Sequence, residues 1–190
     1  NILIGQTSKF TVAVLDFEPR GITELEAATL TDRFTSELNN TDIMRLVERG
    51  MMAEILNEQG FQQSGCTSDE CAVEVGALLG VQKMISGSVG LIQLENINNQ
   101  KRFLTFHSGS LSHNKFSVTF AEAILYSGDN RSLEWQYFNP VLFWTPEMHN
   151  ITTGDGNGFL YAGLKYLYSP SLSFWSEILI DDYRLVIKDW

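Results

Sequence analysis

The two cysteines of this 190-residue chain, Cys66 and Cys71, have its most reactive side chains and lie five positions apart. A structural zinc site needs four Cys or His ligands, and the three histidines, His107, His113 and His149, all lie in the other half of the chain. The spacing also differs from the C-x-x-C of thioredoxin-like proteins. We therefore expect no metal site and no cofactor. A disulfide across the turn between the two cysteines is sterically possible, and two free or half-buried thiols are the alternative.

The acidic residues offer a second kind of chemistry, but their placement does not favour catalysis. Asp16 follows an apolar segment without a histidine, a Ser-His pair or a second acid placed to assist it. A glycosidase needs two carboxylates about 5–10 Å apart across a cleft. The residues that could supply them are Glu122, Glu134, Glu147 and Glu177. No P-loop, GxGxxG, HExxH or GxSxG motif occurs, so we expect a protein that is not an enzyme.

Aromatic residues in the second half of the chain point to binding. Their rings can stack on sugars, and in other proteins they more often pack in a core or an interface. Glu122 interrupts an alternating apolar segment, and a carboxylate there is expected to face a lumen, a partner or water. The possible glycan or interface contacts are therefore Trp135, Tyr137, Trp144, Trp175 and Glu122.

The charge of the chain limits the classes of partner that it can bind. The net charge is −10, and the 13 Lys and Arg residues are scattered. A nucleic-acid-binding surface needs clustered basic residues, so no nucleic acid is expected, and an acidic surface disfavours docking on anionic lipid headgroups. No stretch approaches the roughly 18 consecutive apolar residues of a transmembrane helix. The first residues lack the charged and apolar segments of a signal peptide, so we expect none there.

The use of aromatic residues changes halfway along the chain. Residues 1–95 contain four Phe, Trp or Tyr side chains, whereas residues 96–190 contain 18. A polar, Asn-rich segment lies at the change, over 95–101. We therefore predict two regions with different architectures, one over 1–95 and one over 96–190.

The first region alternates strand and helix signals. Apolar β-branched segments predict strands over 10–17, 43–48 and 81–94. A T-x-x-E capping box at Thr23 begins a predicted helix that ends at Asn39-Asn40. Two further helices are predicted over 50–59 and from a second T-x-x-E box at Thr67 to Gly80. The expected order is β-α-β-α-α-β, a small α/β layer module.

The second region has almost no helical periodicity. Strands are predicted over 116–126, 132–138, 159–168 and 172–180, with turn signals between them. The predicted class is therefore α+β, with an antiparallel β-rich half that forms a partial barrel or an open sheet. Aromatic strands of this kind suit either a carbohydrate-binding sandwich or a membrane barrel.

Three segments of the first region carry a family resemblance. They are VAVLDFEP (12–19), RLVERGMMAEILNEQGFQ (45–62) and CTSDECAVEVGALLGVQKMISGSVG (66–90). Over about residues 9–94 the chain resembles the CsgG-type family of bacterial envelope proteins, which includes curli assembly components and periplasmic activators of the LpoB kind. The resemblance implies a periplasmic module that acts by protein–protein contact. It does not imply a pore, because residues 1–95 show no pair of amphipathic strands for a membrane hairpin.

Four segments of the second region carry another resemblance. They are RFLTFHSGSL (102–111), FAEAILYSG (120–128), LEWQYFNPVLFW (133–144) and SEILIDDYRL (176–185). Residues 102–185 look like part of a Wzi-type capsule-assembly barrel of the outer membrane. Five or six strands cannot close such a barrel, which has many more.

Both resemblances imply the envelope of a Gram-negative-type bacterium. We therefore expect an assembly or secretion-associated protein of the periplasm or outer membrane. The expected partners are other envelope proteins, surface polysaccharide and a second copy of the chain. A soluble carbohydrate-binding sheet fused to an α/β domain is the alternative. An oxidising periplasm would permit a Cys66–Cys71 disulfide.

Overall fold

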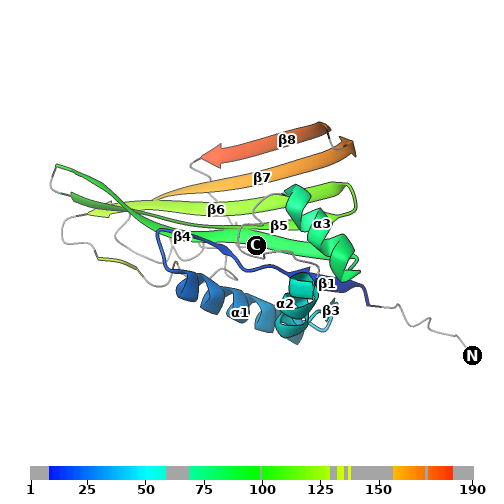
Figure 1. The fold of residues 1–190 in the computed structure, drawn as a ribbon. Coiled ribbons are helices and arrows are strands. Elements are labelled where there is room, and N and C mark those ends of the chain that lie inside the picture. The colour runs from blue at the N-terminus through cyan, green and yellow to red at the C-terminus, as the bar shows by residue number, and fades with distance from the viewer. Residues whose placement is uncertain are drawn as a thin grey trace, which may run out of the picture.

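A mixed sheet with helices on both faces of one end forms the body of the molecule (Figure 1). The computed structural model describes residues 9–58, 69–98, 100–128, 132–134, 137, 156–169 and 171–181. The predicted α+β class is confirmed. The elements in chain order are β1 (Thr11–Val14), β2 (Glu18–Arg20), α1 (Glu24–Asn40), β3 (Arg45–Leu46), α2 (Arg49–Glu58), α3 (Asp69–Leu79), β4 (Lys83–Ile97), β5 (Gln100–His113), β6 (Phe116–Gly128), β7 (Gly156–Ser169) and β8 (Leu172–Asp181).

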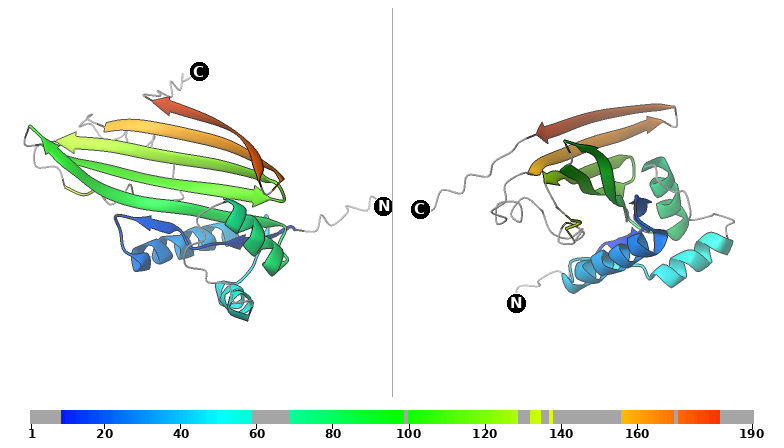
Figure 2. Two further views of the ribbon diagram at one scale, coloured as in Figure 1. Left: turned by 45° about the horizontal axis from the view of Figure 1, so that its top comes forward. Right: turned by 90° about the vertical axis from the view of Figure 1, so that its left-hand side faces the viewer.

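The sheet changes from parallel to antiparallel across its width. Its strand order is β3-β1-β4-β5-β6-β7-β8, with β2 also pairing with β4. The strands β1, β2 and β3 join the sheet by parallel pairs, and every pair from β4 to β8 is antiparallel. Parallel strands need crossover connections, which here contain α1, α2 and α3, whereas the antiparallel strands β4, β5 and β6 follow one another through short hairpin turns. The helices therefore cover only the β1–β4 end (Figure 2).

Helix α1 covers one face of this end, and its start is set locally. The side chain of Thr23 accepts a 3.2 Å hydrogen bond from the backbone N–H of Glu26, while the Glu26 carboxylate accepts one of 2.7 Å from the N–H of Thr23. This confirms the predicted capping box. The hydrogen bonds that the Glu26 carboxylate accepts from the backbone N–H and the hydroxyl of Thr23 lower the pKa of Glu26. Thr31 then accepts a 2.9 Å bond from the N–H of Phe17, which ties the helix to the chain after β1.

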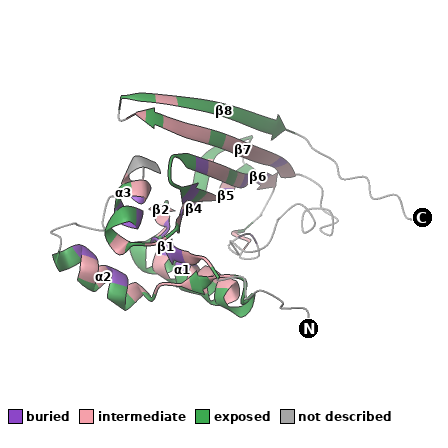
Figure 3. Cartoon of the chain, turned by 90° about the vertical axis from the view of Figure 1, so that its right-hand side faces the viewer, coloured by how far each residue is buried: buried purple, intermediate pink, exposed green. Residues whose placement is uncertain are grey.

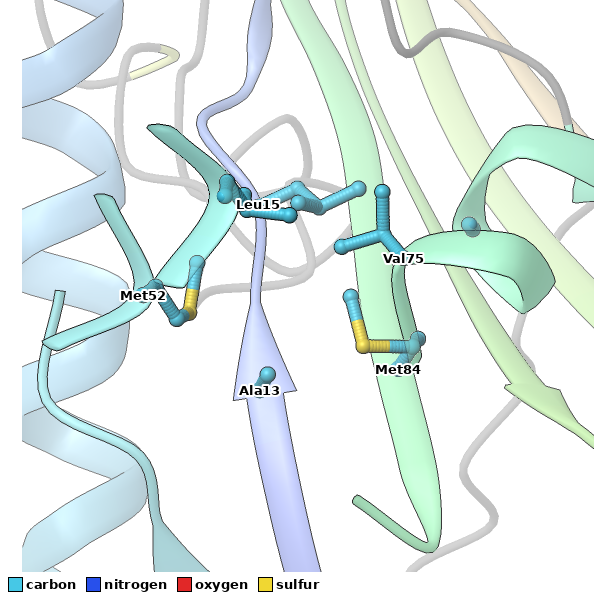
Figure 4. Packing of buried hydrophobic residues seen from close by; sticks show 7 residues of the cluster. Ala13, Leu15, Met52, Val75 and Met84 are labelled. Carbon is cyan, nitrogen blue, oxygen red and sulfur yellow. The ribbon is translucent and has the colours of Figure 1, made fainter. Parts of the chain in front are cut away.

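Helices α2 and α3 cover the opposite face. Successive residues of a strand point to opposite faces, so Ala13 and Leu15 face α2 and α3 while Val12 and Val14 face α1. Figure 4 shows the α2–α3 side, where Ala13 and Leu15 of the β1 segment meet Met52, Val75 and Met84. Both faces of β1 are therefore buried, as expected of a parallel strand between helix layers.

Close backbone packing explains the glycine at position 90. A Cβ at Gly90 would lie 2.5 Å from the carbonyl oxygen of Arg20 and 2.6 Å from the ring of Phe106. The register of β4 with β5 runs without a shift through this point. Gly90 therefore marks a close backbone approach and not a bulge. The strand β2, which the sequence analysis did not predict, is the backbone that approaches.

The predicted boundary at 95–101 coincides with a hairpin turn. Ile97 pairs with Gln100 across the turn, and Asn98 has a φ of 51°, which suits a two-residue hairpin loop. The register of β4 with β5 shifts between Ile97 and Leu94, and from Leu94↔Arg102 the two strands pair continuously back to Met84 and Ser112. The regions 1–95 and 96–190 thus contribute strands to one sheet.

Several predicted elements differ from those observed. Residues 100–113 were not predicted as a strand, because their Ser, Gly and His residues give a weak β signal, yet they form the long strand β5. The strand predicted over 132–138 is wrong for its described residues, since 132–134 are irregular and Tyr137 lies in a short 3₁₀ turn. Thr67 lies outside the described residues. None of the helices in the described part of the chain combines the length and hydrophobicity that a membrane-spanning helix needs.

Candidate functional site

An apolar groove lies on the α1 face of the sheet, where the helix leaves the strands uncovered. Its volume is about 800 Å³. The groove begins at Phe34 of α1 and Ile85 of β4 and extends across the sheet to Ile178 of β8. Two of its wall residues are strongly exposed, Phe120 at 61% and Ile178 at 61%. Exposed apolar surface that is continuous over several strands marks an interaction site more often than a chance feature.

Strand alternation creates this face. In β6 the residues Val118, Phe120 and Glu122 point to the same side, and all three line the groove. Their partners on β5 are Leu111, Gly109 and His107, which line it too. At one end of the sheet the same face is closed by Tyr137, which is 1% exposed and whose ring lies 5.3 Å from that of Tyr126.

A buried polar pair sits in the wall of the apolar groove. His107 and Glu122 are direct cross-strand partners. Their Nε2 and Oε2 atoms are 3.9 Å apart, and the two side chains are 14% and 1% exposed. This distance is too long for a hydrogen bond, so the two groups interact through their charges and dipoles. Such a pair gives the groove one polar point where a bound chain could be oriented.

Burial determines the charge state of His107 in this pair. It lowers the pKa of His107 to about 4, and the Glu122 carboxylate opposes that shift. The imidazole is therefore neutral at neutral pH and becomes charged only in clearly acidic solution. At neutral pH the pair is a neutral ring beside a buried acidic side chain and not a salt bridge.

The opposite face of the same strands is polar. Three cross-strand pairs of hydroxyl groups run along it at 2.7–2.9 Å, namely Ser88–Ser108, Ser110–Thr119 and Ser112–Ser117. Farther along this face Trp175 is 70% exposed, and with Lys165 and Glu177 it lines a hollow of about 340 Å³. The two faces therefore differ in chemistry, one apolar and the other suited to hydrogen bonding.

The predicted contact residues do not form one site. Glu122 lines the apolar groove and is 2% exposed, so of the three expected surroundings, a lumen, a partner or water, the structure shows little contact with water. That it contacts a partner stays a prediction. Tyr137 is a core residue beneath the same face, whereas Trp175 lies on the other face. Trp135 and Trp144 lie outside the described residues.

Only Cys71 of the two cysteines lies among the residues that the structure describes. Cys71 lies in α3 and packs, half-buried, against the cluster of Ala13, Leu15 and Met52. Cys66 lies outside the described residues, so its pairing with Cys71 stays a prediction. Within the described ranges, no three His, Cys, Asp or Glu side chains come together as a possible metal site.

The sequence analysis missed His107, although a local signal could have found it. Asn114 has a φ of 52° and lies in the two-residue turn between His113 and Phe116. Asn is favoured at such positions. Once this turn is recognised, counting back along both strands places His107 opposite Glu122.

Two of the four carboxylates considered for glycosidase chemistry, Glu122 and Glu177, are separated by the sheet. Glu134 follows β6, and its backbone N–H donates a 3.3 Å hydrogen bond to the hydroxyl of Tyr126. Glu122 is opposite Leu160 of β7, whereas Glu177 is opposite Gly163. Positions 160 and 163 of one strand point to opposite faces, so these two carboxylates cannot flank one bond. Glu147 lies outside the described residues.

Comparison with solved structures finds only weak similarity. The chain is similar to the LpoB C-terminal domain from Escherichia coli, with 17% identity over 58% of this chain and 76% of that one and a TM-score of 0.43. It is also similar to lipoprotein GNA1162 from Neisseria meningitidis, with 9% identity over 75% and 99% and a TM-score of 0.48. These low values add nothing to a functional assignment, and no curated protein matches.

A family model gives a firmer result. The model described as "Curli production assembly/transport component CsgG" matches residues 6–101. This span includes all three segments that carried the first resemblance and contains every element from β1 to β4. The match ends at the start of β5, so the Wzi-type resemblance of 102–185 has no support from it. Over its N-terminal half and the first long strand, this chain belongs to the CsgG family.

Proposed function

We propose that this protein is a non-enzymatic component of the bacterial cell envelope that acts by protein–protein contact. Membership of the CsgG family supports the location. The observation that carries the mode of action is the apolar groove of about 800 Å³ beside α1. A face of this kind is costly to leave in water, and a partner protein that buried Phe120 and Ile178 would remove the cost.

The arrangement of polar groups supports a role without catalysis. His107 and Glu122 form a pair in a groove lined mostly by apolar side chains, and the Glu177 carboxylate lies on the other face of the sheet. A general acid and base pair must reach one substrate from suitable positions. The proposed role of His107 and Glu122 is to orient a bound segment.

Other envelope proteins are the proposed partners, at the periplasmic side of the outer membrane. The Wzi-type resemblance of residues 102–185 is the basis for placing the protein at that membrane and in capsule assembly. An oxidising periplasm also agrees with the predicted Cys66–Cys71 disulfide. Thiol titration of denatured protein with and without reductant would test it, since equal values would exclude the disulfide.

Site-specific photo-crosslinking in a Gram-negative host tests the proposed contact surface. The chain is exported behind a signal peptide, with a photoreactive amino acid at position 120 in the groove or at position 25 on α1. Leu25 is 78% exposed and does not line the groove, so it serves as the matched control. We expect discrete products with envelope proteins from position 120 and not from 25. Equal labelling from both positions would contradict the proposal.

The polar face favours a second candidate function, the binding of surface polysaccharide. Trp175 is exposed beside Lys165 and Glu177, and an indole ring with polar neighbours suits stacking on a sugar. Tryptophan fluorescence titrated with capsular polysaccharide would report binding if the change disappears in Trp175→Ala. A response that persists in this variant would place binding elsewhere, and no response in the parent chain would reject this function.

A further inference from the structure

The strand β8 forms a bare edge of the sheet. It pairs with β7 along its length, from Phe159↔Asp181 to Ser169↔Leu172, and no described strand pairs with its other side. Nine of its ten residues are exposed, including Trp175 at 70% and Ile178 at 61%. Figure 3 shows the exposed colour along almost the whole strand. A row of backbone N–H and C=O groups therefore lies open for pairing.

Most of the usual features that protect an edge are missing from this strand, whose only charged residues are Glu177 and Asp181 at its end. Natural edge strands are kept from pairing by lysine, proline, bulges or short length. Between Leu172 and Asp181 there is no Lys, Arg or Pro, and the only register shift with β7 lies at the turn, between Leu167 and Ser169. An open edge of ten regular residues with six large apolar side chains is suited to bind another strand.

We propose that β8 pairs antiparallel with β8 of a second copy of this chain, around a two-fold axis. The other described edges are shorter than β8. Strand β3 has two residues and β2 has three, and β4 has no described partner for Leu91–Ile97 on the side where it pairs with β1 and β2. A head-to-tail contact from β8 to any of these edges would leave part of β8 unpaired. Only β8 offers a strand of equal length, and pairing of identical surfaces closes the assembly as a dimer.

The residues of β8 select one register. With the axis at Ser176, Phe174 lies opposite Ile178 and Leu172 opposite Ile180, so apolar residues meet on the groove face. On the other face this register places Trp175 opposite Glu177. Moving the axis by one residue to Glu177 would place two carboxylates directly opposite each other, which destabilises a sheet.

The dimer would join the two grooves. A two-fold axis perpendicular to the sheet keeps the α1 faces of both copies on the same side. The wall residue Ile178 of each copy would then lie beside Phe174 of the other, and the apolar face would continue across the axis. This inference rests on the edge and its register alone, so it holds or fails separately from the proposed envelope function.

Disulfide trapping of the full chain tests the register. Ser176→Cys is oxidised under mild conditions beside two matched variants, Glu177→Cys on the same strand and Leu25→Cys on α1, with the parent chain as background for Cys66 and Cys71. We expect a covalent dimer in high yield from Ser176→Cys and at least fivefold less from the other two. Equal yields from all three variants would overturn the proposal.

Sedimentation measures the same contact without a cross-link. We expect the parent chain to form a dimer and Ser176→Glu, which places two carboxylates at the axis, to raise the dissociation constant at least tenfold. Ser173→Glu places its carboxylate opposite Leu179, so its change should be less than threefold. Circular dichroism confirms that each variant is folded. A monomer at all concentrations, an open-ended aggregate, or a monomer whose β8 amides are protected by residues 182–190 would each overturn the proposal.

Discussion

The two ends of the sheet bury their side chains very differently. At the β1 end, Val12 and Ala13 point to opposite faces and are both 0% exposed. At the β8 end, Ile178 and Leu179 also point to opposite faces and are 61% and 67% exposed. The two segments have similar apolar composition. The difference is that crossover helices pack on both sides of β1, whereas no described helix packs against β8.

This contrast indicates that β8 gains less stability from the burial of its side chains than its apolar sequence would suggest. Apolar strands with both faces exposed gain little from the hydrophobic effect within their own chain. Stability should therefore be concentrated at the helix-covered end, and the bare end should be where a partner adds most. Four pairs of variants test where the stability of the sheet is concentrated.

Leucine truncation gives the largest contrast. Leu56 is 1% exposed between α2 and the sheet, and Leu56→Ala should lower the free energy of unfolding by about 2–5 kcal/mol because it leaves a cavity. The same change at Leu179, 67% exposed on β8, should alter it by less than about 0.5 kcal/mol. Urea unfolding at low protein concentration measures both. Equal losses would show that β8 is buried in solution.

Acid should weaken the strands between the two ends. The pKa of His107 is about 4 in the folded chain, against 6.5 ordinarily. The unfolded chain therefore binds more protons between these values, and the free energy of unfolding should fall by up to about 3 kcal/mol as the pH falls from about 6.5 to 4. His107→Gln should flatten this slope, and His113→Gln, at an exposed position, should retain it. Unchanged pH slopes in both variants would contradict the assigned burial.

Adding a methyl group distinguishes close packing from open space within the sheet. Gly90→Ala would press a Cβ against the Arg20 carbonyl, so it should cost about 1–3 kcal/mol. Gly109→Ala adds the same group where no atom lies within 4 Å, and it should be close to neutral. Thermal unfolding of both variants measures the difference. A neutral Gly90→Ala would mean that β2 does not approach β4 so closely.

The helix cap provides the smallest effect. Thr23→Ala removes the side chain that accepts a bond from Glu26, and it should cost about 1 kcal/mol. Thr29→Ala, on an exposed turn of the same helix, should be neutral or slightly stabilising, since Ala favours helices. Hydrogen exchange should show faster exchange in α1 for the first variant while β8 is unchanged. A change in β8 would mean that the two ends are coupled.

Predictions from the sequence were more accurate for the helix-covered end of the sheet than for the strands beyond it. The capping box at Thr23 and the helix end at Gly80 were both predicted, because caps and C-terminal glycines act within a few residues. The weak strand β5 was missed, although it lies in the middle of the sheet. Its stability comes from pairing with β4 and β6, and a short window of sequence does not contain those partners.

The candidate site followed the same division. Glu122 was singled out from its position in an alternating strand, and it does lie in the groove. The sequence analysis did not bring it together with His107, whose partner depends on the register across the β5–β6 turn. The sequence also did not predict that Tyr137 and Trp175 lie on opposite faces of the sheet, because this depends on how distant segments pack against it.

The sequence alone was enough to predict the capped helices, most of the strands and the α+β class. It also carried the family of residues 6–101 and the alternation that puts Phe120 and Glu122 on one face. Which face is apolar, which strand is left as an edge, and which residues of neighbouring strands lie opposite each other depended on the tertiary structure. The physical reason is that caps, turns and alternation act over a few residues. Coverage of a strand instead depends on where distant helices dock, and here α1, α2 and α3 pack only at the end of the sheet where parallel strands require them.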